Sequence, residues 1–245
     1  MPEIITSKDN RKIKEAISYR DGKGEFFLVE GFHMVEMALS SGSAIQVFSL
    51  KQYDTKGVDF YLVNEAVMKK LTTSKNPEGI VALCKKKQPK EMTGKAILYL
   101  DELQDPGNVG TLLRTALAFG YPDVILSQGT ASAYSSKTLS SSQGAIFFLN
   151  VKESGFSPEE DIKTLKKEGY WILATDLRSS VPLQGLSVPS NFVLILGNEG
   201  KGVSELVRKS ADFIVSIPMI GKINSLNASV AAGIFIYEVV RQRSN

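Results

Sequence analysis

Cysteine and histidine are nearly absent from this chain of 245 residues, which contains one of each, Cys84 and His33. A single cysteine excludes an internal disulfide bond and any zinc site built from cysteines. A single histidine removes most catalytic triads and most metal centres, so we expect no metal cofactor. His33 precedes Glu36 by three residues on a predicted helix, and we interpret it as a packing or surface residue.

Long apolar runs are absent as well. No run approaches the roughly 20 residues that a membrane-spanning helix needs, and no basic N-terminal segment leads into an apolar one. We therefore expect a cytoplasmic protein without a membrane partner. With 43% hydrophobic and 22% charged residues, the composition is that of an ordinary globular protein, long enough for one large domain or two small ones.

Positive charge is modest in total but uneven along the chain. The formal net charge of +3 is too small to indicate a nucleic-acid partner by itself, so the distribution of charge matters more. The segment 85–95 (KKKQPKEMTGK) holds five lysines and one glutamate, and it predicts a flexible linker that either binds backbone phosphates or only adds solubility. Residues 7–19 predict a basic amphipathic helix, whose charged face either contacts phosphate or is simply solvated.

The residues before this linker predict a small α/β domain. We expect helices over 7–19, 31–39 and 65–71, and strands over 25–29, 44–50, 59–63 and 80–84. Strands and helices that alternate in this way pack as three layers.

The residues after the linker predict an α/β fold with an open parallel sheet. Their continuous apolar runs are typical of strands buried on both faces. We expect strands over 96–100, 123–127, 146–151, 170–175, 191–197 and 213–217, and helices over 108–120, within 135–148, and over 158–168 and 227–241. Ligands of such sheets bind at the carboxyl ends of the strands, where Thr175, Gly197 and Ile217 lie.

The predicted helix 108–120 has two distinct faces. Asn108 opens it, Gly120 ends it, and its apolar stripe consists of Val109, Leu112, Leu113, Ala116 and Leu117. Arg114 projects roughly 100 to 140° away from this stripe. Its guanidinium therefore either forms a surface salt bridge or serves as an anion clamp or catalytic group.

Residues 197–204 (GNEGKGVS) are rich in glycine and contain a lysine, as phosphate-binding loops do. They fail the pattern G-x-x-x-x-G-K-[ST], because Gly202 follows Lys201 in place of a hydroxyl residue. This failure disfavours a nucleotide-dependent enzyme. What remains is a glycine-rich turn whose backbone can approach a ligand closely, with Glu199 in its middle.

Residues 217–232 place polar side chains at the entrance of the last helix. Ser225, Leu226 and Asn227 stand immediately before a long apolar pattern. Ser225 or Asn227 either only caps this helix or, together with the helix N-terminus, binds an anionic or electron-rich ligand. The helix 227–241 is apolar around most of its circumference, so we expect a second subunit to cover it in a homodimer.

Three of these segments together are similar to the three ordered motifs of the SpoU/TrmH branch of the SPOUT RNA methyltransferases. They are NVGTLLR (residues 108–114), LGNEGKG (196–202) and IPMIGKINSLNASVA (217–231). Their joint occurrence in this order is far more specific than any one of them. The order of elements before the linker also resembles the ribosomal-protein-like RNA-binding domain that often precedes this catalytic domain. The resemblance implies an RNA substrate-binding domain over 1–84, a linker over 85–95 and a methyltransferase domain over 96–245.

The resemblance further implies an S-adenosylmethionine-dependent enzyme that methylates a ribose 2′-hydroxyl of ribosomal or transfer RNA, as a homodimer joined through the C-terminal helix. It also implies a C-terminal trefoil knot, which general topology rules would not predict. It places cofactor contacts at Thr175, Gly197, Ile217 and Leu226. It places the active site at Arg114, Asn108, Glu199, Ser225 and Asn227, and it requires no metal.

Arg114 is the residue usually assigned in this family to activate the 2′-hydroxyl. An arginine pKa above ~12 makes a free guanidine base costly, so we favour a role in holding phosphate or in stabilising the developing alkoxide. Asn108, Glu199 and Asn227 would orient Arg114 and the ribose by hydrogen bonds. The competing hypothesis is a catalytically inactive RNA-binding or ribosome-assembly protein on the same fold, and the intact set of polar residues argues against it.

Overall fold

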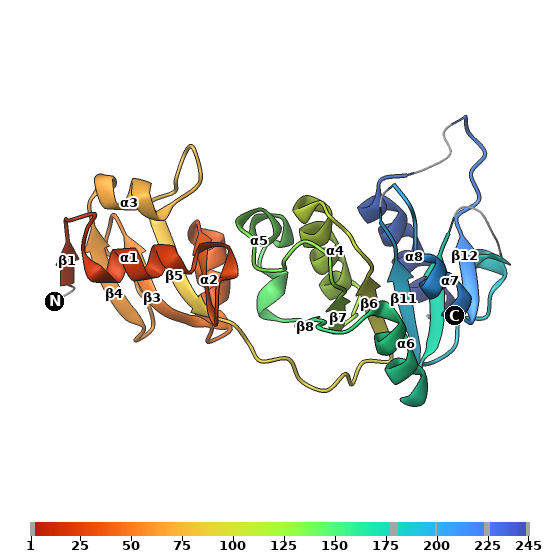
Figure 1. The fold of residues 1–245 in the computed structure, drawn as a ribbon. Coiled ribbons are helices and arrows are strands. Elements are labelled where there is room, and N and C mark those ends of the chain that lie inside the picture. Colours follow the sequence, from red (N-terminus) through yellow and green to blue (C-terminus); the bar gives the residue numbers. More distant parts are fainter. Residues whose placement is uncertain (1–2, 177–180, 199, 223–225, 244–245) are drawn as a thin grey trace.

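The computed structural model describes residues 3–176, 181–198, 200–222 and 226–243, and it contains two sheets joined by the segment 86–95 (Figure 1). The first sheet has the strand order β1-β4-β3-β5-β2. Its strands are β1 (Glu3–Ile5), β2 (Phe26–Glu30), β3 (Ala44–Ser49), β4 (Asp59–Val63) and β5 (Ile80–Lys85). β5 runs antiparallel to β2 and β3, whereas the other pairs are parallel. The sequence patterns did not predict β1, which has only three residues.

Helices cover both faces of this first sheet. They are α1 (Arg11–Ser18), α2 (Phe32–Ser40) and α3 (Glu65–Leu71). α1 and α3 pack on one face, where Ile13 and Val67 are fully buried. α2 packs on the other face through Val35 and Ala38. Each helix buries one apolar face against the sheet, as amphipathic helices do, although Phe32 at the start of α2 is 44% exposed.

The second sheet has seven strands, and all of its pairs are parallel, as the apolar runs predict. The strand order is β10-β12-β9-β11-β6-β7-β8. The strands are β6 (Ala96–Leu100), β7 (Asp123–Leu126), β8 (Asn150–Glu153), β9 (Trp171–Thr175), β10 (Val181–Pro182), β11 (Phe192–Leu196) and β12 (Phe213–Ser216). Every residue of β6 and β11 is buried, which explains their continuous apolar sequences.

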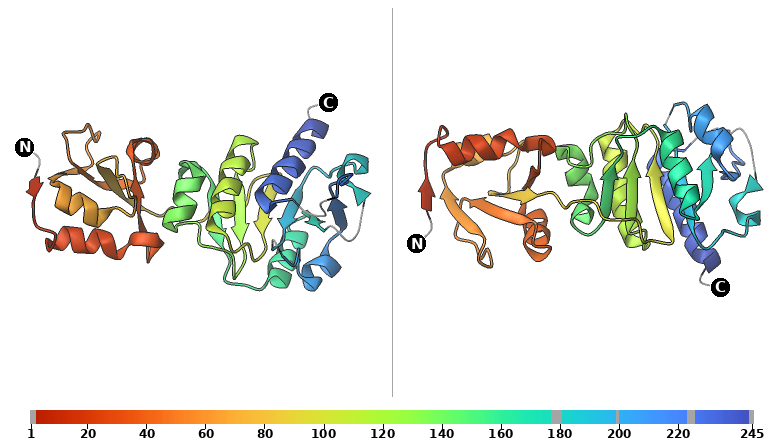
Figure 2. Two further views of the ribbon diagram at one scale, coloured as in Figure 1. Left: turned by 90° about the horizontal axis from the view of Figure 1, so that it is seen from above. Right: turned by 60° about the horizontal axis from the view of Figure 1, so that its bottom comes forward.

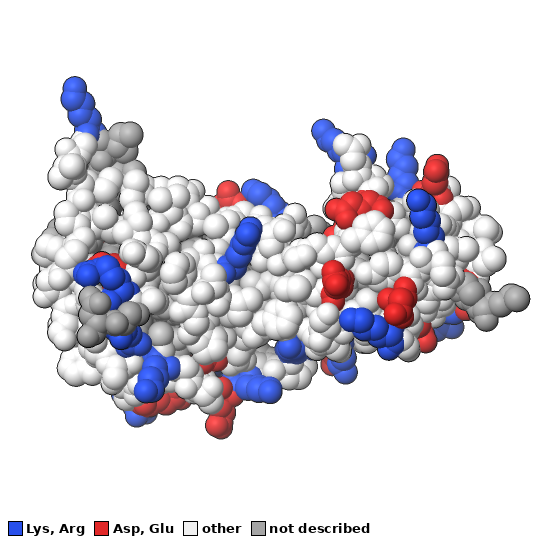
Figure 3. Space-filling model, turned by 180° about the vertical axis from the view of Figure 1, so that it is seen from behind, with Lys and Arg blue, Asp and Glu red and all other residues white. Residues whose placement is uncertain are grey.

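Helices also cover both faces of the second sheet (Figure 2). α4 (Pro106–Ala118), α5 (Ser136–Ser142) and α8 (Ala228–Arg243) lie on one face, and α6 (Pro158–Lys167) and α7 (Glu205–Ser210) lie on the other. Figure 3 views the molecule from the side of α4 and α8, and the surface over this part of the chain is largely uncharged.

Two helical regions differ from the sequence-based expectation. α4 begins at Pro106 with Asp105 as its N-cap, so Asn108 lies in the first turn and does not open the helix. Leu117, which the apolar stripe predicts to be buried, is 36% exposed, because the stripe is wider than the surface that α4 covers. The predicted helix within 135–148 ends at Ser142, since the next two residues take left-handed backbone angles and start a separate 3-10 turn.

The segment 86–95 has no regular secondary structure, yet hydrogen bonds hold it along the edge of the second sheet. The buried Asp123 carboxylate accepts hydrogen bonds from the Thr93 and Gly94 amides at 3.1 and 2.7 Å. Asn150 accepts a hydrogen bond from the Lys90 amide at 2.9 Å and donates to the Asp123 carboxylate at 2.6 Å. The lysine-rich composition predicts a flexible linker, but these contacts attach the segment to β7 and β8.

The two halves of the molecule share one continuous apolar core. The buried cluster that includes Phe27 of β2 continues through Tyr134 and Phe147 to α4 and α8. The Phe27 ring lies 5.0 Å from the Tyr134 ring and 5.9 Å from the Phe147 ring, measured between centroids. Apolar burial on this side therefore fixes the first sheet and its helices against α5.

Candidate active site

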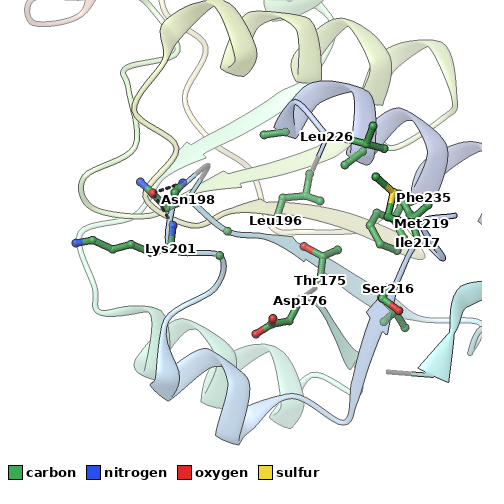
Figure 4. Close-up of a pocket in the computed structure, with 16 residues that line it drawn as sticks. Thr175, Asp176, Leu196, Asn198, Lys201, Ser216, Ile217, Met219, Leu226 and Phe235 are labelled. Atoms are coloured by element: carbon green, nitrogen blue, oxygen red, sulfur yellow. Dashed lines mark hydrogen bonds between the residues drawn. The ribbon is translucent and has the colours of Figure 1, made fainter. Parts of the chain in front are cut away.

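A cavity of about 510 Å³ lies at the carboxyl ends of β9, β11 and β12 (Figure 4). The start of α8 closes its remaining side through Ala228, Ala231 and Phe235. Its position is the one that parallel α/β sheets use for ligands. The lining residues are Thr175, Asp176, Leu196, Gly197, Asn198, Gly200, Lys201, Gly202, Val215, Ser216, Ile217, Met219, Leu226, Ala228, Ala231 and Phe235.

The glycine-rich segment after β11 folds back tightly on its own start. A Cβ atom at Gly197 would come within 3.0 Å of the Gly202 carbonyl carbon and the Val203 nitrogen. The Asn198 side chain holds the turn, because its Oδ1 accepts hydrogen bonds from the Gly200 and Lys201 amides at 2.9 and 3.3 Å. The side chain of Lys201 extends away from the other labelled residues in Figure 4. The cavity wall here therefore consists mainly of backbone.

The buried carboxylate of Asp101 forms a hydrogen bond at the end of the same loop. Asp101 follows β6, and its Oδ2 accepts a hydrogen bond from the Ser204 amide at 3.3 Å. The backbone amide of Asp101 in turn donates to the Leu196 carbonyl at 2.8 Å. Burial raises the pKa of Asp101 above its usual value, because desolvation disfavours the charged carboxylate.

A second buried carboxylate, Asp176, lines the cavity directly. Its side chain is 3% exposed, and its Oδ2 lies 3.2 Å from a guanidinium nitrogen of Arg208 on α7. The sequence-based reasoning selected Thr175 at the end of β9 and missed this neighbour. An acidic residue at the carboxyl end of a parallel strand is the signal that could have identified it.

Asn108 and Asn227 meet at the border of the cavity. The Asn227 Nδ2 donates to the Asn108 Oδ1 at 3.1 Å, although 119 residues separate them. The Asn227 Oδ1 also accepts hydrogen bonds from the Ser229 and Val230 amides at 2.9 and 3.3 Å, so Asn227 is the N-cap of α8. The cap and the contact to α4 therefore use different atoms of one amide.

Arg114 lies on the exposed surface of α4 and does not line the cavity of its own chain. Within the part of the chain that the structure describes, the Arg114 side chain forms no hydrogen bond and no salt bridge. Leu117, one helical turn further on, is exposed as well. The surface salt bridge that the sequence left open for Arg114 is thus absent among the described residues.

The structure brings together all four residues for which the sequence predicts cofactor contacts, Thr175, Gly197, Ile217 and Leu226. Glu199 and Ser225 lie outside the described residues. The described ranges contain no group of three or more His, Cys, Asp or Glu side chains that could hold a metal ion. Within the same ranges, no helix is both long and apolar enough to cross a membrane.

Comparisons with known proteins match both halves of the chain to families. The model of the SpoU rRNA Methylase family matches residues 95–237. The model of the MRM3-like substrate binding domain matches residues 8–82.

Similar individual proteins extend over nearly the whole chain. The chain is 35% identical over 246 aligned residues to the 23S rRNA (guanosine(2553)-2′-O)-methyltransferase RlmP of Bacillus subtilis (strain 168), covering 96% of this chain and 98% of the relative. A solved structure described as an RNA 2′-O ribose methyltransferase is 30% identical with a TM-score of 0.81, over 99% of this chain and 100% of that one. The AdoMet-bound rRNA methyltransferase from Sinorhizobium meliloti is 27% identical with a TM-score of 0.86, over 98% of this chain and 97% of that one.

Proposed function

The chain belongs to the SpoU rRNA methylase family of RNA methyltransferases, and from this premise we propose that it transfers a methyl group from S-adenosylmethionine to a ribose 2′-hydroxyl of ribosomal RNA in the cytoplasm. One observation carries the proposal. Thr175, Gly197 and Ile217, from the ends of three different strands, line a single cavity together with Leu226, and the Asn108–Asn227 pair lies at its border.

The residues of the cavity fit S-adenosylmethionine. Its volume of about 510 Å³ falls within the usual range of ligand pockets, roughly 300–1,000 Å³. Leu196, Val215 and Phe235 offer apolar surface to an adenine ring, and the backbone around Gly197 offers hydrogen-bonding groups at close range. The Asp176 carboxylate suits hydroxyl or ammonium groups of the cofactor. When bound, S-adenosylmethionine would supply an electrophilic methyl group on a sulfonium.

The chain's own residues would supply alignment and exclusion of water, and the ribose hydroxyl would lose its proton to an acceptor as the methyl group moves from the sulfonium to the oxygen. Asn108 and Asn227 would orient the ribose, since they bond each other and Asn227 stands between Leu226 and Ala228, which line the cavity. Arg114 would hold a phosphate of the RNA or stabilise the developing alkoxide. Glu199 and Ser225 are included in this proposed active site only because they belong to the sequence motifs.

A homodimer would explain why Arg114 does not line the cavity of its own chain. Exposed apolar side chains continue along α4 and α8, and they are Leu117, Phe119, Val230, Ile234 and Tyr237. The same side of the molecule is largely uncharged (Figure 3). Arg114 borders this surface, because it precedes Leu117 by three residues on the same helix. Pairing through α8 would bury the apolar surface and bring each Arg114 towards the cavity of the other subunit.

The trefoil knot is part of the same proposal. The segments 197–204 and 217–226 come from separate motifs, and residues of both line one cavity, as a knotted cofactor site requires. The N-terminal region, which matches a substrate-binding domain, would bind the RNA.

Calorimetry with S-adenosylhomocysteine separates this function from an inactive RNA-binding protein on the same fold. We expect binding with one site per chain, and we expect methylation of ribosomal RNA at a 2′-hydroxyl when S-adenosylmethionine is added. Mapping 2′-O-methyl groups in ribosomal RNA from a deletion strain identifies the nucleotide. If the folded protein shows no heat of binding with S-adenosylhomocysteine, the inactive RNA-binding protein is favoured. If the modification is confined to transfer RNA, the substrate class is transfer RNA and not ribosomal RNA.

A further inference from the structure

A second cavity, of about 570 Å³, lies between the N-terminal domain and α5, away from the candidate active site. Its walls come from residues 20, 28–34, 72–80 and 136–143. We call it the interdomain cleft. The inference drawn from it rests on the function proposed above, because it concerns the RNA substrate.

Direct contacts hold the two walls of the interdomain cleft in place. The Asp21 carboxylate accepts hydrogen bonds from the Ser136 amide and hydroxyl at 2.9 and 2.6 Å. These bonds lower the pKa of Asp21, so it is charged at neutral pH. The His33 Nε2 donates to the Gln143 carbonyl at 3.2 Å. Because the walls also share the continuous apolar core, the cleft is preformed, and a ligand would not have to order it.

The polar groups of the cleft suit a ligand that carries both negative charge and hydroxyl groups. The Arg20 Nη2 donates to the Lys70 carbonyl at 2.7 Å, but the buried Arg20 Nε has no partner among the described residues. The Lys137 side chain on the opposite wall is 62% exposed, although it pairs with Asp105 at 2.8 Å. Threonine and serine residues also line the cleft.

Two carboxylates, Glu30 and Glu78, line the cleft as well, and both are hydrogen-bonded to its wall. Glu30 accepts hydrogen bonds from the Thr73 amide and hydroxyl at 2.7 and 2.9 Å and from the Ser74 amide at 3.2 Å. Glu78 accepts one from the Phe32 amide at 2.8 Å. Both negative charges are therefore turned towards backbone amides of the wall. Phosphate and ribose groups of RNA are recognised by arginine, lysine and hydroxyl side chains such as those that remain.

An exposed aromatic pair stands next to the cleft. Phe32 is 44% exposed between two residues that line the cleft, Gly31 and His33. Its ring lies 5.9 Å from the Tyr53 ring, measured between centroids. An exposed ring held by a neighbour is a platform on which an unpaired base stacks, worth roughly 1–3 kcal/mol per base in single-strand binding proteins.

A continuous row of contacts leads from the cleft to the candidate active site. Lys137 pairs with Asp105, the N-cap of α4, and Asn108 in the first turn of α4 bonds Asn227 at the border of the cofactor cavity. α4 and α5 cross closely, because a side chain at Gly110 would overlap atoms of α5. In Figure 1, α5, α4 and α8 follow one another in this order away from the first sheet, and the start of α8 lines the cofactor cavity.

We propose that the interdomain cleft binds a single-stranded segment of the substrate RNA that adjoins the target nucleotide. Arg20 and Lys137 contact its phosphates, and the Phe32–Tyr53 pair stacks on an unpaired base. The RNA then bridges both domains, and the spacing between the cleft and the cofactor cavity contributes to the choice of nucleotide.

RNA binding measured at several salt concentrations tests the charged contacts. The variants are Arg20→Gln and Lys137→Gln, and Lys163→Gln on the exposed surface of α6 is the matched control. Each cleft variant is expected to bind RNA about tenfold more weakly, and the slope of log affinity against log salt should fall by ~0.7 per lost phosphate contact. KM for RNA should rise with little change in kcat, and binding of S-adenosylhomocysteine should match wild type.

Phe32→Leu tests the stacking contact, because leucine keeps apolar volume but removes the flat ring. Trp171→Leu, at the start of β9, is the control, since Trp171 is also exposed and also pairs with a second ring. We expect weaker RNA binding for Phe32→Leu only, together with loss of ultraviolet cross-linking between RNA and the peptide that contains Phe32.

Unchanged RNA affinity and salt slope in both charge variants, with melting temperatures equal to wild type, would refute the cleft as an RNA site while leaving the methyltransferase function intact. A wild-type protein that binds RNA through the cleft but never binds S-adenosylhomocysteine would instead refute the proposed function. The two failures are therefore distinguishable.

Discussion

Gly197→Ala offers the most direct test of how the candidate cofactor site is built. The added Cβ would lie within 3.0 Å of the Gly202 carbonyl carbon and the Val203 nitrogen, and both are backbone atoms that no side-chain rotation can move. Ordinary carbon contacts are about 3.5 to 4.0 Å, so the turn that follows β11 must shift by more than 1 Å. Gly197 does not occupy the left-handed region, so the effect comes from space alone.

The shift should affect cofactor binding more than stability. Overpacking of this kind costs about 1–3 kcal/mol, which for a chain of 245 residues lowers the melting temperature by roughly 2 to 10 °C. Because the displaced turn is a wall of the cavity, its shift should weaken hydrogen bonds and contacts to S-adenosylhomocysteine and lower the affinity by about tenfold or more. Calorimetry on folded protein measures this loss.

Gly155→Ala is the matched control. A Cβ at Gly155 meets no atom within 4 Å, and its backbone angle is also compatible with alanine, so affinity and melting temperature should both equal those of wild type. The reasoning is refuted if Gly197→Ala binds S-adenosylhomocysteine as tightly as Gly155→Ala does, because the close approach at β11 would then be irrelevant to the cofactor.

Four further predictions concern the N-cap of α8, the Arg114 guanidinium, the proposed dimer and the buried Asp101 carboxylate. Asn227→Ala should lower kcat and cost ~1 kcal/mol of stability through loss of the α8 cap, so activity must be compared at equal folded fraction; unchanged turnover would remove Asn227 from the active site. Arg114→Lys should lose most of the methylation rate, and a variant that keeps it would show that the fork-shaped guanidinium is not needed. Ile234→Glu should convert a dimer to monomers in light scattering, whereas Leu206→Glu on α7, where the side chain is 54% exposed against 39% for Ile234, should not; a wild-type monomer would contradict the proposal. The pKa of Asp101 is higher in the folded protein than in the unfolded chain, where it is near 4, so the stabilising contribution of Asp101 is complete below pH 4 and is lost as the pH rises through the folded pKa. The melting temperature of Asp101→Asn should therefore rise relative to wild type between pH 4 and pH 8. A difference in melting temperature that stays constant with pH would contradict a raised pKa.

Local sequence patterns were sufficient for most of the helices and strands and for three residues at strand ends that line the cavity. Hydrophobic periodicity and burial are properties of short segments. The apolar runs of β6 and β11 therefore predict buried parallel strands, and the structure confirms them. Parallel strands present their carboxyl ends at one edge, which is why Thr175, Gly197 and Ile217 lie together in one cavity.

Only the tertiary structure decided the features that depend on residues distant in sequence. β9, β11 and β12 are neighbours because of the strand order, which no single segment encodes. The contact between Asn108 and Asn227, the burial of Asp176 against Arg208 and the cleft between the domains all arise from packing of whole elements. Sequence periodicity reports which face of an element is buried, whereas the identity of its neighbour depends on the sum of many weak apolar contacts over the entire chain.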